Sequence, residues 1–331
     1  MIPEARIRVP DRVPGMSART VTITGGSGFI GQLLQRGLRA RGYRVDVFDR
    51  LRGPIVNAVR RTHLGTGTSP RAIACARRLR RGQARLEQAL IRVGVLGPSW
   101  DDILDLRSRL VERFRKSYAV VHLAALPHPN VPGAAEADYR RINYDGAVNV
   151  FEAAQAAAVP KFVFASSAQV YGINKPIRIE QFPILESNYL PTLSEGQSIY
   201  GALKAQFERY LAAGCKTGRT QAVALRLECP GVRSNVPWNF YISTSIENTV
   251  TAFACALEAE LPTGFAVCNV ADEHVDPAIV DVQAFLEAHW AGVPNHTRGN
   301  ESLLSIETAR RLLGYAPTRS GTYYPLPLIW G

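Results

Sequence analysis

The chain has 331 residues, of which 46% are hydrophobic, and its formal net charge is +11. This length allows one large domain or a domain with a smaller lobe, and the composition is sufficient for a sizeable core. No apolar run approaches the roughly 20 residues that a membrane-spanning helix needs, which argues against an integral membrane protein.

Residues 1–18 are rich in Arg and Pro and lack the apolar segment of a signal peptide. We expect a disordered leader there, and Met16, just before the first strand, offers an alternative start of translation. Five cysteines lie scattered without a C-x-x-C pair. They indicate reduced thiols in a cytoplasmic protein rather than a disulfide framework or a zinc site.

A dinucleotide-binding turn follows the first predicted strand, residues 20–24. Gly26, Gly28 and Gly31 form G-x-G-x-x-G, and a helical run continues from the last glycine to about residue 40. These glycines permit a tight turn and a close approach of the backbone to a pyrophosphate, which rests on the helix N-terminus. The pattern therefore predicts a nucleotide cofactor.

The second predicted strand, residues 44–48, ends at an acidic residue, Asp49. An acid about 20 residues after the glycines holds the ribose hydroxyls of adenosine and repels a 2′-phosphate. Asp49 therefore favours NAD, although Arg50 leaves some room for NADP.

A basic insertion is predicted at 51–100. Residues 50–100 contain eleven Arg, no Lys and one acid, and they account for most of the net charge. Apolar residues recur at helical spacing over 72–93. Either this is a solvated helix packed on the body, or it is an electropositive lid or docking face for an anionic substrate, carrier or partner. Aromatic residues are absent from 50–99, which argues against nucleic-acid binding by base stacking.

The remaining elements alternate between helices and strands, as in a doubly wound α/β fold with a parallel sheet. We predict helices over 102–116, 134–158 and 198–215 and strands over 119–123, 161–165 and 221–227. Ligands of such folds bind beyond the carboxyl ends of the strands.

Three residues carry the predicted chemistry. Tyr200 and Lys204 lie four positions apart in YGALK, which places them on one face of a helix. A nearby ammonium favours the phenolate, so we expect Lys204 to lower the pKa of Tyr200 and make it a proton acceptor. Ser167 follows a buried strand and lies at the edge of the sheet that faces this helix.

The order and spacing of these motifs resemble the extended short-chain dehydrogenase/reductase superfamily, the NAD-dependent epimerase/dehydratase family. The resemblance covers about 20–331, interrupted by 51–100. The matching segments are TGGSGFIG (24–31), Asp49, Asp105-Leu106, VVHLAA (120–125), Asn143, SSAQVYG (166–172), YGALK (200–204), ALRLECPG (224–231) and LLGYAP (312–317).

The resemblance implies a Rossmann-type domain over 19–230, a small substrate lobe over 231–331 with segments that return to the core, and a homodimer formed through the helices 134–158 and 198–215. It implies that Ser167 binds the reacting oxygen, that Tyr200 is the acid/base and that Lys204 holds the nicotinamide ribose. It also implies these contacts to NAD: Gly25, Gly28, Phe29, Ile30, Gly31, Asp49, Arg50, Asp105, Leu106, Leu123, Ala124, Ala125, Asn143, Ser166, Tyr200, Lys204 and Pro230.

Departures from the family pattern narrow the expected reaction. The sugar-nucleotide dehydratases have Asp-Glu where this chain has Ala168-Gln169, so dehydration is disfavoured. Nucleotide-sugar epimerases usually have Asn in place of Cys229 and a longer segment after it, so the usual cradle for UDP looks truncated. A compact lobe of this kind resembles that of the sugar-acid dehydrogenases.

We therefore expect an NAD-dependent oxidoreductase that acts on a secondary alcohol or ketone of a small sugar-like or carboxylated substrate. An epimerase that oxidises its substrate transiently is the alternative, and a non-catalytic NAD-binding sensor is a weaker one. No metal site is expected, and His122, inside a buried strand, is expected to be a core residue. The candidate substrate contacts are His128, Asn130, Arg233 and Trp238.

Overall fold

A computed structural model describes residues 19–49, 102–131, 134–173, 179–188, 198–216 and 218–324. The predicted leader, Arg50 and the basic insertion at 51–100 lie outside the described residues. Within them, no helix combines the length and the apolar character that crossing a bilayer would require.

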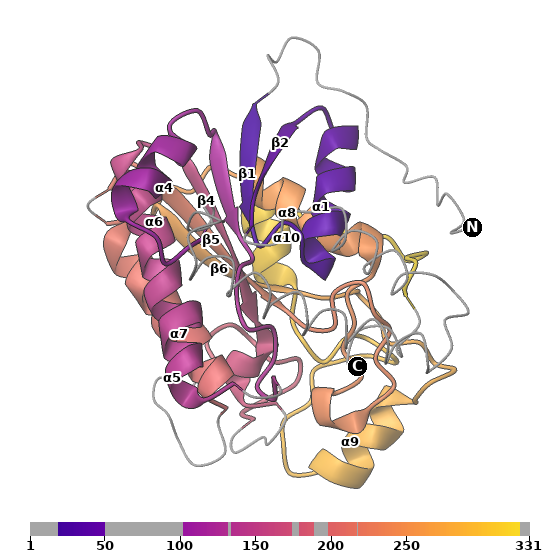
Figure 1. The fold of residues 1–331 in the computed structure, drawn as a ribbon. Helices are drawn as coiled ribbons and strands as arrows, with labels where there is room; N and C mark the ends of the chain where they lie inside the picture. Colours follow the sequence, from indigo (N-terminus) through magenta and orange to yellow (C-terminus); the bar gives the residue numbers. More distant parts are fainter. Residues whose placement is uncertain are drawn as a thin grey trace, which may run out of the picture.

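A parallel sheet of six strands forms the centre of the described part, in the order β2-β1-β3-β4-β5-β6 (Figure 1). Its strands are β1 Thr20–Thr24, β2 Arg44–Phe48, β3 Ala119–His122, β4 Lys161–Ser167, β5 Gln221–Leu227 and β6 Phe265–Val270. Every residue of β3 and β4 is buried, because helices cover both faces of a sheet of this kind. The predicted doubly wound α/β fold is confirmed.

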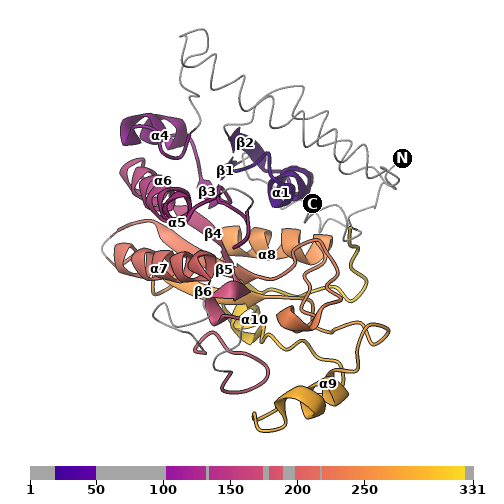
Figure 2. The same ribbon diagram turned by 60° about the horizontal axis from the view of Figure 1, so that its bottom comes forward.

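Helices form a layer on each face of the sheet (Figures 1 and 2). On one face lie α1 Phe29–Ala40, α8 Ile246–Glu258 and α10 Glu307–Leu313. On the other lie α4 Arg107–Phe114, α5 Glu136–Tyr139, the π-helical η1 Arg140–Asp145, α6 Gly146–Ala156 and α7 Ile199–Gly214. The helix α9 Val282–Trp290 lies apart from both layers (Figure 1). The shorter turns are η2 Ala168–Tyr171 and η3 Pro237–Asn239.

Two predicted helices differ from the observed ones, one in its regularity and the other in where it begins. The segment 134–158 contains a π-helical stretch, η1, between α5 and α6. The helix predicted over 102–116 begins only at Arg107, because the side chains of Asp102 and Asp105 accept backbone N–H groups within two residues of themselves. Such local bonds compete with the helical ones and hold the segment in turns.

The order in which strands are added to the sheet reverses between β1 and β3. It passes from β1 outward to β2 and then returns to β3 on the other side of β1. Leu123 N donates to Thr24 O at 3.1 Å, so the chain that leaves β3 starts level with the end of β1. In open α/β sheets this reversal is where ligands bind.

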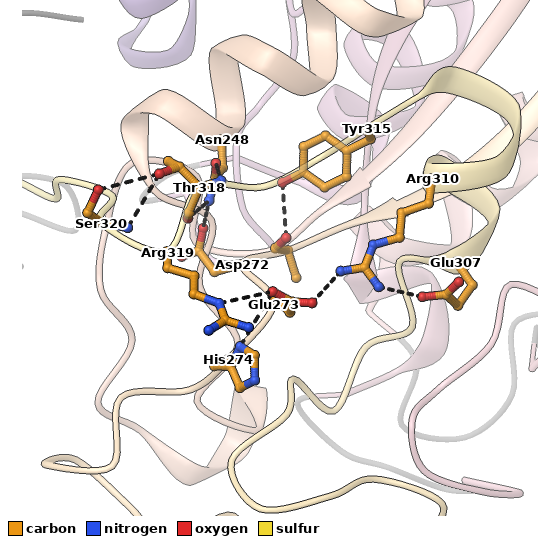
Figure 3. Close-up of polar contacts among 11 residues, drawn as sticks. Asn248, Asp272, Glu273, His274, Glu307, Arg310, Tyr315, Thr318, Arg319 and Ser320 are labelled. Carbon is orange, nitrogen blue, oxygen red and sulfur yellow. Dashed lines mark hydrogen bonds and ion pairs between the residues drawn. The ribbon is translucent and has the colours of Figure 1, made fainter. Parts of the chain in front are cut away.

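A C-terminal segment, residues 315–324, ties the edge of the sheet to α8 (Figure 3). Asn248 bonds Thr318 twice, through Nδ2 to the carbonyl at 3.0 Å and through Oδ1 from the N–H at 2.7 Å. Tyr315 Oη donates to Ala271 O at 3.0 Å. The elements α8, β6 and α10 follow residue 231 in the chain and pack with the sheet or with the helices on it. The boundary between the Rossmann-type domain and the small lobe at 230/231 stays a prediction.

Candidate active site

The glycine turn packs against the chain that leaves β3. Gly25 has a φ of +68°, and a Cβ atom there would lie 2.6 Å from Ala124 N. A Cβ atom at Gly31 would lie 2.3 Å from Gly26 O. Only glycine fits either position, and the resulting turn presents backbone N–H groups at the start of α1, an arrangement that binds phosphate. The turn therefore fits a dinucleotide.

Asp49 lies directly over this turn. Its Oδ2 accepts the N–H of Ser27 at 2.8 Å, which fixes the carboxylate between β2 and the glycines. Asp49 is thus held beside the glycine turn, and its contact with a ribose stays a prediction. Its neighbour Arg50 lies outside the described residues.

Two further predicted cofactor contacts lie beyond the sheet edge. Asp105 pairs with Arg109 at 3.1 Å, and its carbonyl accepts Asn149 Nδ2 at 2.9 Å. The side chain of Leu106 is 66% exposed beside it. Contacts to α4 and α6 hold Asp105 in place, and the contact of Asp105 and Leu106 with an adenine stays a prediction.

Asn143 fastens the loop after β3 to η1. It is buried, its Oδ1 accepts Leu126 N at 2.7 Å, and its Nδ2 donates to Leu126 O at 3.1 Å. A π-helical turn in a helix is frequently found at functional sites. Asn143 therefore fixes the backbone of Leu126, the residue that follows the predicted cofactor contacts Leu123–Ala125.

The three predicted catalytic residues converge at the carboxyl end of β4. Ser167 ends that strand and hydrogen-bonds the phenol of Tyr200, which comes from the first turn of α7. Lys204 lies one turn further along α7, and its Nζ is 5.6 Å from the centre of the Tyr200 ring. All three side chains are buried.

The prediction that Lys204 lowers the pKa of Tyr200 is not supported by the groups of the protein itself. Burial raises the pKa of Tyr200 above its ordinary value, the carboxyl of Glu228 raises it further, and the bond with Ser167 opposes both. Burial also lowers the pKa of Lys204 to about 7, so this ammonium is itself easily lost. Sequence spacing gives the right neighbours but not the desolvation, which dominates here.

Aromatic rings and a neutral histidine surround Lys204. Its Nζ donates to Ala165 O at 2.7 Å and lies 4.5 Å from the ring centre of Phe164. His122 stacks on the same Phe164 ring and bonds Thr24 Oγ1 at 2.7 Å. Burial lowers the pKa of His122 to about 3, with Lys204 adding to the shift, so the prediction of a core histidine is confirmed.

Ser166 belongs to a buried ionic network that braces the site. Its Oγ donates to Glu208 Oε1 at 2.5 Å, and the same carboxylate is gripped by Arg226 through Nε at 3.0 Å and Nη2 at 2.7 Å. Arg226 also donates to Tyr171 Oη at 2.7 Å. This network joins β4, β5 and α7, so it fixes the strand that carries Ser167 against the helix that carries Tyr200.

The chain turns sharply after β5, next to the predicted cofactor contact Pro230. Cys229 and Gly231, on either side of it, have φ angles of +42° and +75°. Gly231 N donates to Thr244 O at 2.6 Å, which ties the turn to the start of α8. Tyr324 N bonds Gly231 O at 2.8 Å, and the Tyr324 ring packs on Phe29 of the glycine turn.

The candidate substrate residues occupy two different places. The loop with His128 and Asn130 is held by Tyr139, whose Oη donates to His128 O at 2.8 Å and whose side chain belongs to the same buried cluster as Tyr200. This contact places the loop near the predicted catalytic tyrosine. Trp238 is 59% exposed on η3.

Arg233 is already engaged by protein groups. It forms an ion pair with Asp276, and its guanidinium lies 4.4 Å from the centre of the Tyr323 ring. A substrate anion would therefore have to compete with Asp276 for this charge.

Three residues near Tyr200 were missed by the sequence analysis: Glu228, Asn239 and Tyr139. Glu228 follows β5 directly, hydrogen-bonds the side chains of Gln169 and Asn239, and acts on Tyr200. An acid at the carboxyl end of a buried strand was the available signal. Tyr139 gave no signal, because its partner His128 O is a backbone atom.

No group of three or more His, Cys, Asp or Glu side chains in the described ranges is arranged to hold a metal ion.

Curated relatives are about 30% identical to the chain over the segments that align with it. A UDP-glucose 4-epimerase from Homo sapiens is 30% identical over 213 residues, which are 63% of this chain and 53% of that protein. A D-erythronate dehydrogenase from Cupriavidus necator is 31% identical over 258 residues, 76% of this chain and 65% of that protein. With the UDP-glucose 4-epimerase 2 of Oryza sativa, the match covers 39% of that protein. The chain thus spans about half of the length of these epimerases or less.

Solved structures show the same fold at lower identity. The UDP-glucuronic acid 4-epimerase from Bacillus cereus, in complex with NAD, superposes with a TM-score of 0.59 at 19% identity and covers 94% of this chain and 98% of its own. A mutated uronate dehydrogenase gives a TM-score of 0.58 at 17% identity, with 92% and 83% covered.

A family model matches residues 21–230, which include β2 to β5, all but the first residue of β1, the glycine turn and all three catalytic candidates. A match over more than half of the chain, on the fold and the site described above, places this protein in the NAD dependent epimerase/dehydratase family.

Proposed function

We propose that the chain is an NAD-dependent oxidoreductase that interconverts a secondary alcohol and a ketone of a small sugar-like or carboxylated substrate. The observation that carries this proposal is the buried contact between Ser167 and Tyr200 with Lys204 one helical turn away. A purely structural role would not require two hydroxyls and an amine to be buried at the ligand-binding edge of the sheet.

NAD would be held by the glycine turn, by Asp49 and by the residues after β3. When bound, it supplies the hydride acceptor or donor and, in its oxidised form, a positive charge. The protein's own work is positioning and proton transfer. Ser167 would bind the reacting oxygen, and Tyr200 would exchange a proton with it. Lys204, anchored on Ala165 O, would bind the nicotinamide ribose.

Two observations support a dehydrogenase over an epimerase: the coverage of one relative and the ion pair of Arg233. The D-erythronate dehydrogenase match covers 76% of this chain, more than the matches to the two epimerases above. Arg233 is occupied by Asp276, which leaves less cationic charge for a nucleoside diphosphate. The alternative, a sugar epimerase, is supported by the sequence identity to the UDP-glucose 4-epimerases.

We further propose a homodimer built on α6 and α7 and a reducing compartment, the cytoplasm. The scattered free thiols of Cys215, Cys229, Cys255 and Cys268 support the second point.

A substrate panel distinguishes these functions. The purified protein is offered NAD with sugar acids, free polyols and nucleotide sugars, and both the reduced-nicotinamide absorbance and the sugar configuration are followed. The proposal expects net formation of NADH with a sugar acid or polyol. A change of configuration without net NADH would establish the epimerase, and NAD binding with no turnover of any substrate would favour the sensor.

A further inference from the structure

The helix α7 and the turn η2 meet at their backbones beside the predicted catalytic hydroxyls. A Cβ atom at Gly201 would lie 2.2 Å from Gln169 O, closer than real Cβ atoms approach an oxygen. Only the hydrogen of a glycine fits there. Gly201 follows Tyr200 directly in the chain, and Gln169 lies two residues after Ser167. The contact therefore joins the two segments that carry the hydroxyls.

The backbone of Gln169 serves both of these segments. Its N–H donates to Ser167 Oγ at 3.2 Å, and its carbonyl meets Gly201. A hydroxyl that accepts one hydrogen bond still donates its own hydrogen, and Ser167 bonds the phenol of Tyr200. The place of Gln169 therefore determines both how the Ser167 hydroxyl is directed and how near α7 comes to it.

The carbonyl of Gln169 is held firmly. It accepts the N–H of Gly172 at 3.1 Å, the bond that closes η2, and Gln169 itself is buried. An atom added at Gly201 would therefore have two ways to be accommodated. Either α7 moves away from η2, or η2 opens and turns Ser167 with it. Both movements separate Ser167 from Tyr200.

The start of α7 brings the glycine to this place. Ser198 is the N-cap, and its Oγ accepts the N–H of Gly201 at 3.1 Å. A capping bond of this kind fixes where a helix begins and which residues its first turn presents. With this register, the helix brings Tyr200 to the end of β4 and Gly201 to η2.

Helix propensity alone would favour another residue at position 201. Glycine inside a helix is less favourable than alanine, because it loses more conformational freedom on folding. Elsewhere the helix uses alanine, at Ala202, Ala205, Ala212 and Ala213. Small residues of α7 can thus carry a methyl group, and the contact with Gln169 O accounts for the glycine at 201.

We propose that Gly201 is a positioning residue of the active site: its missing side chain lets α7 dock on the carbonyl of Gln169, and this contact sets the distance between Tyr200 and Ser167. The inference rests on the proposed function, in which both hydroxyls act on one oxygen of the substrate. A methyl group at 201 would displace the two segments by about 1 Å, since non-bonded atoms prefer about 3.5 Å. A misplacement of about 1 Å costs about 10²-fold in rate.

The test follows the contact between Tyr200 and Ser167 by NMR, in protein labelled at the tyrosine ζ carbon, with Tyr200→Phe identifying the resonance. Ser167→Ala removes the bond and defines the shift that its loss produces. In Gly201→Ala we expect the Tyr200 resonance to move toward its position in Ser167→Ala. Gly214→Ala is the matched control, because its methyl would meet Phe151 Cε1 at 2.6 Å, about 20 Å further along the same helix. We expect the wild-type resonance there, although denaturant unfolding should show a loss of stability in both glycine variants.

A wild-type Tyr200 resonance in folded Gly201→Ala would overturn the proposal, and so would an equal shift in Gly214→Ala. Should Gly201→Ala not fold, Ser198→Ala takes its place, because it deletes the bond that holds Gly201 N without adding an atom. A partial shift toward the Ser167→Ala position is then expected, and an unchanged resonance would contradict the proposal.

Turnover on the substrate panel is measured with the same proteins. We expect it to fall by about 10²-fold in Gly201→Ala and to stay near the wild-type rate in Gly214→Ala. Wild-type turnover in Gly201→Ala would overturn the positioning role. A shifted Tyr200 resonance in a protein that turns over no substrate, even as the wild type, would leave the docking contact standing and contradict the proposed function instead.

Discussion

At the scale of single residues, Asp49 determines which dinucleotide the site accepts. Asp49→Asn keeps an oxygen for Ser27 N, so the glycine turn is preserved, but removes the charge that repels a 2′-phosphate. We expect NADP affinity relative to NAD to rise about tenfold, or about 1.4 kcal/mol. Asp46→Asn removes an acid from β2, the strand that leads to Asp49, and serves as the control. An unchanged ratio of the two dissociation constants, measured by calorimetry, would exclude Asp49 from the ribose site.

At the scale of elements, the glycine turn depends on close contacts that only one residue type permits. In Gly31→Ala the new methyl would lie 2.3 Å from Gly26 O, so the turn must open. We expect a loss of about 1–3 kcal/mol in unfolding free energy and at least a tenfold loss in NAD affinity. Gly292→Ala, where no atom lies within 4 Å, is the matched control. Wild-type NAD affinity in Gly31→Ala would show that the turn does not bind the cofactor.

Sequence patterns predict these elements well but give little of the electrostatics within them. Gly31 and Tyr200 belong to short motifs whose spacing is set by local geometry, so their places on α1 and α7 could be predicted. Glu228 and Tyr139 reach Tyr200 only through the pairing of β4 with β5 and the folding of the loop after β3. Burial then reverses the expected direction of the Tyr200 pKa, because desolvation depends on the whole packing around the phenol.

At the scale of the whole molecule, the buried histidine of β3 makes stability depend on pH. The folded-state pKa of His122, about 3, lies below its unfolded value of about 6.5, so the unfolded chain binds this proton more readily. Its contribution is complete above about pH 6.5 and is lost as the pH falls, by about 4 kcal/mol at pH 3. In His122→Asn, which keeps a polar partner for Thr24, denaturant unfolding at about pH 7 and pH 4.5 should differ less than in the wild type. An equal loss in both proteins would contradict a neutral buried His122.

The most direct measurement of the central claim compares the wild type with Tyr200→Phe, for NAD binding and for reduced-nicotinamide formation with the best substrate of the panel. The variant lacks only the phenolic oxygen that bonds Ser167. The account predicts that Tyr200→Phe binds NAD with a dissociation constant within about threefold of the wild type and loses turnover by at least about 10²-fold. Turnover at the wild-type rate in Tyr200→Phe would contradict it.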